Sequence, residues 1–556
     1  MKPLTKTDFI LYRNCPHNVW VKIHEPSQYS KFEISDFEKS LAVMGNEVEE
    51  IARGMFPDGY LVEKRSDGAQ DLTKKLVAQK TAIIFQAVFA TEKYLAATDI
   101  LVWNTSANAY DMYEIKMSST TAGEESEESE IEDEKPEKSA PKKSSSRELQ
   151  FEYDLAFQAN VFEMCGVKVN NKYLIRLNKK YKKAGDLDFS ENQLFVTEDK
   201  TETIDTLMPR VLIEMEEAHE FLSPAEMPTH PCPCYYRGRS SHCTAFSYIN
   251  KDVPEYSVHD INRIGNSKKL LKELLDEGIL HIEKVREDQL PKIKEAKEGQ
   301  KQSKPRKQNQ VAVHKSKEPI RDIYAIKAEL SSLQFPLYFL DYETYPHAIP
   351  FFDGYHPYQH IVFQYSLHVL TEDDFKNGRE PKHFECLILD GDPAERLVES
   401  LRANIGNTGS IISWYKKFEN SRNRELAELV PLHFEFLHNV IARTYDLMDI
   451  VDNQYYVHHG FKGSSSIKKV LPVIKDLLAL PKNVLDYNVL AVKSGTDAIE
   501  AYRKILKGEI VGSAVEKKKQ EMLEYCKLDT EAMYIIWKFF TNLVAQSVQD
   551  GKTAER

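Results

Sequence analysis

The chain has 556 residues, of which 42% are hydrophobic, and its formal net charge at pH 7 is −12. This length exceeds what one hydrophobic core normally holds, so we expect two or three domains. The acidic balance argues against a protein that coats nucleic acid generally, so any groove that binds nucleic acid would be local.

The sequence also limits the compartment. It contains no run of 18 apolar residues, and its first residues, MKPLTKTDF, lack the charged and then apolar pattern of a signal peptide. We therefore expect a cytoplasmic protein with no membrane partner. Its seven cysteines do not indicate a disulfide framework, because disulfides are disfavoured in that compartment.

Helices are expected to open the first domain. Thr5 and Asp8 have the T-x-x-D spacing of a capping box, with Thr7 as the alternative cap, and apolar residues then recur at helical spacing as far as Cys15. Another helix is expected from about Leu72 to Phe85.

Two strand-like segments follow and carry the first chemically suggestive group. YLAATDILVW places Asp99 at the start of an apolar strand, and AYDMYEIKMSS places Glu114 and Lys116 on one face of a second strand, across the loop NTSAN. Two such carboxylates can hold a metal ion, while the ammonium positions a water molecule or stabilises phosphate charge. A hairpin with these residues can also arise by chance.

The order of these segments resembles the RecB-type nucleases of the PD-(D/E)XK class, including AddB-like nuclease domains. The resemblance implies a restriction-endonuclease-like fold in which Asp99 and Glu114 bind the metal ion and Lys116 is the catalytic lysine. It also implies that Gln158, in AFQANVF, is the late glutamine of the family. Many relatives carry a histidine in an early GxxxH motif, where this chain has Glu49 as the candidate replacement.

Residues 122–146 hold nine acidic residues and four lysines with almost no apolar side chains, so we expect a disordered acidic insert within this domain.

Three cysteines gather near the end of the first domain. HPCPCYYRGRSSHC contains Cys232, Cys234 and Cys243, and thiolates on a metal centre are stable in the cytoplasm. RecB-type nucleases with an iron-sulfur cluster have one cysteine before the nuclease core and three after it, so the resemblance implies a 4Fe-4S cluster on these three and Cys15. Zinc remains the alternative, because it also takes four cysteines. Arg237 and Arg239 in the same loop are candidate phosphate contacts, although a solvated loop is an equally good alternative.

The middle of the chain, residues 256–332, is expected to form a helical hairpin and a basic linker. Residues 286–321 hold eleven Lys or Arg against five acidic residues, a balance that suits a nucleic-acid backbone but also suits a plain flexible linker.

The second domain, residues 333–556, begins with the segment PLYFLDYETY. Its apolar run reads as a buried strand that places Asp341 and Glu343 two residues apart on one face. Mg²⁺ or Mn²⁺ bound between these carboxylates would offset their repulsion and lost solvation, although a solvated strand edge is the plain alternative. Later, a strand from Ser410 leads to Glu419, and Tyr525 and Asp529 stand at i, i+4 on a helix.

This order resembles the DnaQ-like exonucleases of the DEDD type, in the subclass with tyrosine and with an RNase H-like fold. The resemblance implies that two metal ions are bound by Asp341, Glu343, Glu419 and Asp529, and that Tyr525 orients or helps to deprotonate the attacking water. The family normally has Asp where this chain has Glu419, so Asp446 is a rival ligand, although its place fits a structural role better. The segment HHGFKGSSSIKKVLP joins small residues to Lys462, Lys468 and Lys469, which makes it a candidate phosphate cradle, although a polar loop before a helix is the plain alternative.

Together these features predict a mixed α/β protein with a PD-(D/E)XK domain at residues 1–255, a joining segment at 256–332 and a DEDD 3′-5′ exonuclease domain at 333–556. The predicted function is metal-dependent hydrolysis of phosphodiesters in repair, recombination or phage defence, with DNA favoured over RNA. The alternative is a nucleic-acid-binding scaffold in which one or both sites are inactive.

Overall fold

The structure of the chain is a computed structural model that describes residues 2–32, 36–63, 66–119, 146–228, 231–293, 303–481, 490, 492 and 494–554. The expected acidic insert at 122–146 lies outside these residues except for Ser146, and so does part of the basic run. The fold is mixed α/β. None of the helices formed by the described residues combines the length and the apolar character that a membrane span needs.

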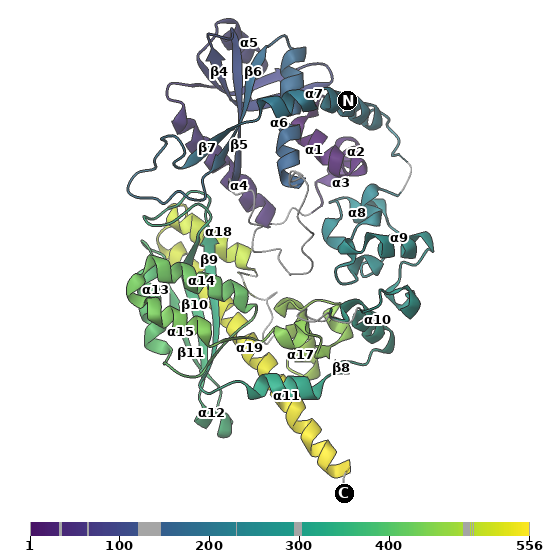
Figure 1. The fold of residues 1–556 in the computed structure, drawn as a ribbon, viewed down its shortest axis with the longest axis vertical. Helices are drawn as coiled ribbons and strands as arrows, with labels where there is room; N and C mark the ends of the chain where they lie inside the picture. The colour runs from purple at the N-terminus through teal and green to yellow at the C-terminus, as the bar shows by residue number, and fades with distance from the viewer. Residues whose placement is uncertain are drawn as a thin grey trace. The chain divides into compact units, whose positions relative to one another are not determined.

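The chain forms two compact units (Figure 1). The first contains Met1–Tyr235, His242–Lys251 and His347–Tyr358, and the second contains Tyr236–Ser241, Asp252–Pro346 and Gln359–Arg556. The expected joining segment, 256–332, therefore belongs to the second unit.

The first unit is built on a seven-stranded mixed sheet with the order β2-β3-β4-β5-β6-β7, and β1 also pairs with β4. The strands are β1 (Leu4–Thr5), β2 (Tyr60–Leu61), β3 (Ile83–Ala90), β4 (Tyr94–Asn104), β5 (Ala109–Ser119), β6 (Val169–Leu177) and β7 (Phe195–Asp199). The antiparallel pair β4 and β5 is the predicted hairpin, and its register sets Ile100 opposite Tyr113.

The helices of the first unit are α1 (Lys6–Asn14), α2 (Pro16–His24), α3 (Pro26–Tyr29), α4 (Asp36–Ala52), α5 (Ala69–Ala78), α6 (Ser146–Met164), α7 (Thr201–Leu222) and α8 (Phe246–Ile249). The capping box at Thr5 is confirmed, because Thr5 and Asp8 each accept a hydrogen bond from the other's backbone. Helices α6 and α7 pack side by side (Figure 1). The helix expected from about Leu72 to Phe85 is shorter in the structure, where α5 ends at Ala78 and β3 begins at Ile83. Lys80 lies between them with a φ of 54°, which a helix does not allow.

The core of the first unit includes part of the connection between β9 and β10. Ala348 and Ile349 are buried in one cluster with Val48, Phe85 and Ile115. The backbone of this connection is also bonded, since the Gly354 N–H donates to the Lys183 carbonyl at 2.8 Å.

The second unit contains a five-stranded sheet with the order β11-β10-β9-β12-β13. Its strands are β9 (Leu337–Pro346), β10 (His360–Leu370), β11 (Lys382–Leu387), β12 (Ser410–Ser413) and β13 (Thr444–Asp446). The pairs β9/β10 and β10/β11 are antiparallel, whereas β9/β12 and β12/β13 are parallel. A separate two-stranded sheet joins β8 (Ile320–Arg321) to β14 (Tyr456–Val457).

The helices of the second unit are α9 (Lys268–Asp276), α10 (Arg306–Ser316), α11 (Ile323–Ser331), α12 (Glu372–Lys376), α13 (Ala394–Asn404), α14 (Lys416–Leu429), α15 (Phe434–Ala442), α16 (Asp449–Asp452), α17 (Ile467–Leu477), α18 (Gly495–Leu506) and α19 (Ser513–Ala554). The long helix α19, yellow in Figure 1, packs against β9 and β10. The helical hairpin was expected within residues 256–285, where the structure forms one α-helix, α9, preceded by short 3-10 turns. Helices α10 and α11 lie in the part expected to be a linker.

Candidate functional site

The second unit brings acidic residues from distant parts of the chain into one buried cluster. Asp341 and Glu343 lie on β9, and ligand atoms of these two residues and of Cys526 on α19 lie within 4.8 Å of one another. Glu343 is 8% exposed and Glu419, in the first turn of α14, is 4% exposed. Groups spread over almost 190 residues of sequence thus reach the same small volume.

The electrostatics of these residues show how closely they interact. Burial and the charge of Asp529 raise the pKa of Asp341 well above its usual value. Burial, followed by the charges of Asp341 and Asp529, does the same to the pKa of Glu343. Burial is also the main cause for Glu419, whose pKa the Asp341 charge raises further. All four predicted carboxylates therefore repel one another in the absence of a cation.

The donor set of this cluster fits a divalent metal ion. The Oε2 atom of Glu419 is buried and has no hydrogen-bond partner among the residues that the structure describes. An orphaned buried carboxylate oxygen is costly, and oxygen ligands are those that Mg²⁺ and Mn²⁺ prefer. The residues present thus suit the ions that the sequence predicts.

Asp446, the alternative ligand to Glu419, is bound by backbone groups of the protein. Its carboxylate accepts backbone N–H groups from Tyr415 (2.9 Å), Lys416 (2.8 Å) and Met448 (3.1 Å). These bonds satisfy its oxygens and fix the start of α14, the helix that carries Glu419. Asp446 also contributes a charge near Glu419, since it is among the causes of that residue's raised pKa.

Two more residues of the second unit border the carboxylates. Tyr525 lies one helical turn before Asp529, and Lys468 in the first turn of α17 places its Nζ atom 5.6 Å from the centre of the Tyr525 ring. The positive charge of Lys468 opposes, without reversing, the rise in the pKa of Glu343 that burial and the neighbouring acids cause. Cys526 is fully buried, and its thiol donates to Asp341 Oδ2 at 3.8 Å.

The first unit contains a second group of acidic and basic side chains, on β4, β5 and α6. Asp99 Oδ2 accepts the backbone N–H of Ile115 (2.8 Å), which holds the Asp99 carboxylate against the strand that carries Glu114 and Lys116. Lys116 Nζ donates to Glu114 Oε1 (2.8 Å) and is also bonded to Asp154. The structure thus brings the predicted residues of the two strands together.

Gln158, the candidate late glutamine, lies beside Glu114. Its Nε2 atom donates to Glu114 Oε2 at 2.8 Å. Its Oε1 atom is buried and has no hydrogen-bond partner among the described residues, so an acceptor is left over inside the group. This leftover oxygen and the Asp99 carboxylate are suitable ligands for a divalent ion.

The acidic residues of this group differ in their affinity for protons. Burial, followed by the negative charge of Glu114, raises the pKa of Asp99 to about 7. Burial also acts to raise the pKa of Glu114, but Lys116 and then Lys6 outweigh it, so that this pKa is lowered to about 2. The pKa of Lys116 is raised, because its two carboxylate partners outweigh its burial.

Glu49, the candidate replacement for the family's early histidine, lies near this group. Its Oε1 atom accepts from Gln86 (2.6 Å) and from Arg53 (2.9 Å), and its charge is one cause of the raised pKa of Asp99. Sequence reasoning missed two further members, Lys6 and Asp154, because neither stands in a recognisable motif.

Four cysteines form the third group. The Sγ atoms of Cys15, Cys232, Cys234 and Cys243 lie within 4.8 Å of one another. Cys15, Cys232 and Cys234 are buried, and Asn250 Nδ2 donates to Cys232 Sγ at 3.4 Å. Hydrogen bonds from neighbouring thiols, Cys15 first, lower the pKa of Cys232, and Cys15 likewise heads the causes that lower the pKa of Cys234 to about 7. Four thiols in this arrangement fit either a zinc ion or an iron-sulfur cluster.

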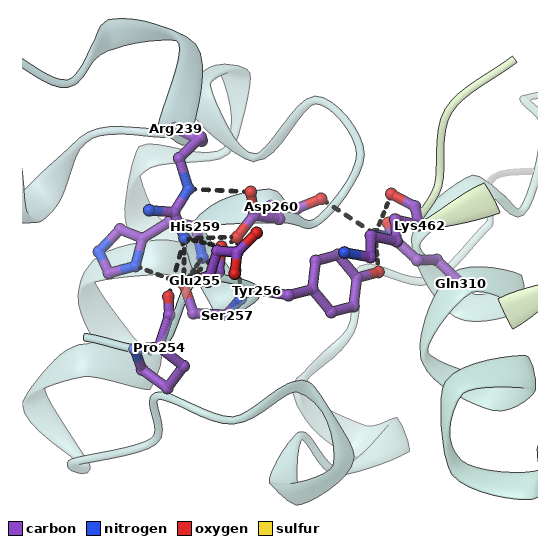
Figure 2. Close-up of polar contacts among 9 residues, drawn as sticks. All are labelled: Arg239, Pro254, Glu255, Tyr256, Ser257, His259, Asp260, Gln310 and Lys462. Carbon is purple, nitrogen blue, oxygen red and sulfur yellow. Dashed lines mark hydrogen bonds and ion pairs between the residues drawn. The ribbon is translucent and has the colours of Figure 1, made fainter. Parts of the chain in front are cut away.

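One predicted phosphate contact has a different role. Figure 2 shows that Arg239 binds Asp260, through bonds of 2.9 and 2.7 Å, and also the carbonyl groups of Pro254 and Glu255. Gln310 on α10 completes this network, because its Nε2 atom donates to Tyr256 Oη and to the Asp260 and Lys462 carbonyls. Arg239 thus helps to hold the middle segment to the rest of the second unit.

Comparison with known proteins gives similarity over part of the chain. Uncharacterized protein MG366 of Mycoplasma genitalium is 26% identical over 216 residues, which are 38% of this chain and 32% of that protein. Its homolog in Mycoplasma pneumoniae is 25% identical over 219 residues, 38% of this chain and 33% of that protein. The aligned part thus spans about a third of the length of these curated relatives. No solved structure matches the chain.

A domain family also matches the second unit. Residues 338–466 are similar to the family described as Domain of unknown function (DUF2779). The matched range contains Asp341, Glu343, Glu419 and Asp446, whereas Tyr525 and Asp529 follow it in the sequence.

Proposed function

We propose that this chain is a metal-dependent nuclease with two active sites, a PD-(D/E)XK site in the first unit and a DEDD-type 3′-5′ exonuclease site in an RNase H-like second unit. The observation that carries the proposal is the buried cluster around Asp341, Glu343 and Glu419, whose carboxylates raise one another's pKa. Burying several acidic side chains together is costly without a compensating cation, and perturbed pKa values concentrate at functional sites.

In the second unit, Asp341, Glu343, Glu419 and Asp529 would hold two Mg²⁺ or Mn²⁺ ions. When bound, such ions supply an activated water and stabilise the charge on the entering and leaving oxygens of a phosphodiester. Tyr525 would orient the attacking water, since its side chain lies one turn from Asp529. The Lys468 ammonium, close to the Tyr525 ring, would neutralise phosphate charge.

In the first unit, Asp99 and Glu114 would hold a metal ion, and the buried Oε1 atom of Gln158 could add a third oxygen ligand. Lys116 is kept protonated by its two carboxylate partners, so it would serve as a donor to a phosphate oxygen or to a water molecule. The two sites use different side chains for the same reaction class, which makes them separable by single substitutions.

The four cysteines would hold a 4Fe-4S cluster, with zinc as the alternative. The wide separation of Cys15 from Cys232 in the sequence supports a structural role, because such a centre ties together the start and end of the first unit. A brown protein with broad visible absorption and bound iron would favour the cluster, whereas a colourless protein with bound zinc would favour the alternative.

The test of the nuclease proposal uses Asp99→Ala, Asp341→Ala and the double variant. Each is assayed on end-labelled single- and double-stranded DNA and RNA, with Mg²⁺, with Mn²⁺ and with EDTA. We expect metal-dependent cleavage by the wild type, a partial loss in each single variant and a complete loss in the double variant. Glu399→Gln, on the exposed face of α13, is the control and should cleave normally. If the wild type cuts no substrate under any condition, the protein is a scaffold.

A further inference from the structure

The group around Glu114 in the first unit contains a second lysine, Lys6, which belongs to no recognised motif. Lys6 is the first residue of α1, and its backbone is held on both sides. Leu4 and Thr5 pair with Tyr94 and Leu95 of β4, and Thr5 caps α1 through the capping box with Asp8. The strand that carries Asp99 therefore also fixes the place from which Lys6 enters the group.

The Lys6 ammonium is bound to the best-buried carboxylate of the group. Its Nζ atom lies 2.6 Å from Glu114 Oε1, the same oxygen that Lys116 contacts at 2.8 Å. Gln158 donates to the other oxygen, Oε2, at 2.8 Å. With Glu114 only 2% exposed, both of its oxygens are thus satisfied by donors from the protein itself.

The two lysines differ in how they are held. Lys116 is anchored by Asp154 as well as by Glu114. For Lys6, Glu114 is the one hydrogen-bond partner among the residues that the structure describes, and its side chain is 22% exposed. Lys6 can therefore leave Glu114 by rotating its flexible stem toward water, whereas Lys116 would have to break two ion pairs.

A metal ion and the Lys6 ammonium compete for the same oxygen. A divalent ion binds a carboxylate oxygen at about 2.0–2.2 Å, closer than any ammonium nitrogen. An ion at Glu114 Oε1 would stand within a few ångströms of Nζ, and the repulsion between a double and a single positive charge beside this buried carboxylate is large. The Coulomb attraction that Lys6 receives from Glu114, Asp154 and Asp99 is the attraction that a metal ion would receive in its place.

We propose that Lys6 is a built-in competitor for the divalent cation of the first site: its ammonium binds Glu114 when the metal ion is absent and must leave that oxygen before a metal ion can bind there. Lys6 thereby sets the metal affinity of the site and keeps the carboxylates compensated in the metal-free protein. This inference rests on the proposed metal site at Asp99 and Glu114, and the following experiment separates the two.

The experiment measures Mn²⁺ binding by electron paramagnetic resonance of the free ion, in the full chain with Asp341→Asn to weaken the second site. Mn²⁺ prefers oxygen ligands, so the cysteine centre does not contribute. We expect Lys6→Met to lower the Kd at the first site at least tenfold, because it removes the competing charge but keeps the stem. Lys6→Gln should act in the same direction and keeps a hydrogen-bond donor if Lys6→Met folds poorly.

The controls decide between the possible results. Lys22→Met removes an ammonium that binds Asp8 at the same end of the chain, and should leave the Kd within twofold. Lys6→Arg keeps the charge and should leave the Kd close to that of the parent. An unchanged or higher Kd in both Lys6→Met and Lys6→Gln overturns the role of Lys6 and leaves the metal site standing.

Adding Asp99→Asn identifies which Mn²⁺ belongs to the first site, since it should remove that binding in every background. If no binding in any variant depends on Asp99, then the proposed metal site is wrong and the role of Lys6 falls with it. Thermal unfolding in EDTA gives an independent readout. The Lys6→Met variant should be less stable than its parent without metal and should gain more stability from Mn²⁺.

Discussion

The carboxylate cluster of the second unit makes a prediction about stability in the absence of metal. Replacing Asp341 by Asn removes one negative charge but keeps the size of the side chain and an acceptor for the Cys526 thiol. Ligand atoms of Asp341 and Glu343 lie within 4.8 Å of each other. At an effective dielectric constant of about 20, two unit charges at this separation repel by about 3 kcal/mol. Protonation of the cluster relieves part of this repulsion, so we expect Asp341→Asn to be stabilised by about 1–3 kcal/mol in EDTA at pH 8.

The dependence of this gain on pH has a definite sign. The pKa of Asp341 is higher in the folded protein than in the unfolded chain, so the folded state binds the proton more tightly. The penalty is therefore absent below the unfolded pKa of about 4 and grows as the pH rises. The stability difference between the variant and the wild type should be larger at pH 8 than at pH 6.

Urea and thermal unfolding of the wild type, Asp341→Asn and the surface control Glu399→Gln measure this effect, with EDTA and with Mg²⁺ or Mn²⁺. The metal ion should stabilise the wild type and Glu399→Gln but stabilise Asp341→Asn much less, because a ligand is missing. A shift of several degrees is within reach for a domain of this size. If Asp341→Asn is less stable than the wild type in EDTA at pH 8, or gains as much from Mg²⁺, then these residues do not form a repulsive metal site.

Three further predictions concern single residues. Glu419→Gln should lower the metal-dependent activity of the second site by about 100-fold or more, with little loss of stability. Asp446→Asn should lower the free energy of unfolding in urea by about 1–2 kcal/mol, because it weakens three hydrogen bonds from backbone N–H groups. Equal losses of activity in the two variants would contradict a ligand role for Glu419 and a structural role for Asp446. Cys15→Ser should lose the bound metal and any visible absorption, measured by elemental analysis and spectroscopy, while Cys386→Ser, outside the cysteine group, should keep both. Because Asp99 must lose its proton to bind a cation and has a pKa of about 7, Mn²⁺ affinity at the first site should rise from pH 5 to about pH 7 and then level off, and a flat profile would exclude Asp99 as a ligand.

Local patterns in the sequence were sufficient for the elements that carry these sites. The T-x-x-D spacing identified the cap of α1, because a capping box depends on residues three positions apart. Alternating apolar residues around a turn-forming segment predicted the hairpin of β4 and β5. Three cysteines within twelve residues predicted a metal-binding group, and the resemblance to RecB-type nucleases added Cys15; the structure brings all four together.

Features that depend on tertiary packing could not be predicted from the sequence. Lys6 stands in the unremarkable segment LTKTD and becomes part of a site only because β1 pairs with β4. The contact between the Cys526 thiol and Asp341 could not be predicted either, since the sequence around a buried thiol has no local pattern that reveals a carboxylate beside it. The helix expected as far as Phe85 was too long for the same reason. Ile83 and Ile84 suit either a helix or a strand, and only their pairing within the sheet decides for the strand.

The segment His347–Tyr358 has a consequence for how this protein could be divided. It follows β9 directly, yet Ala348 and Ile349 fill the core of the first unit. Cutting the chain near residue 333 would therefore leave the amino-terminal fragment with a hole in its interior and would strip a connecting loop of its packing. Point substitutions rather than truncations are therefore the way to test the two proposed sites one at a time.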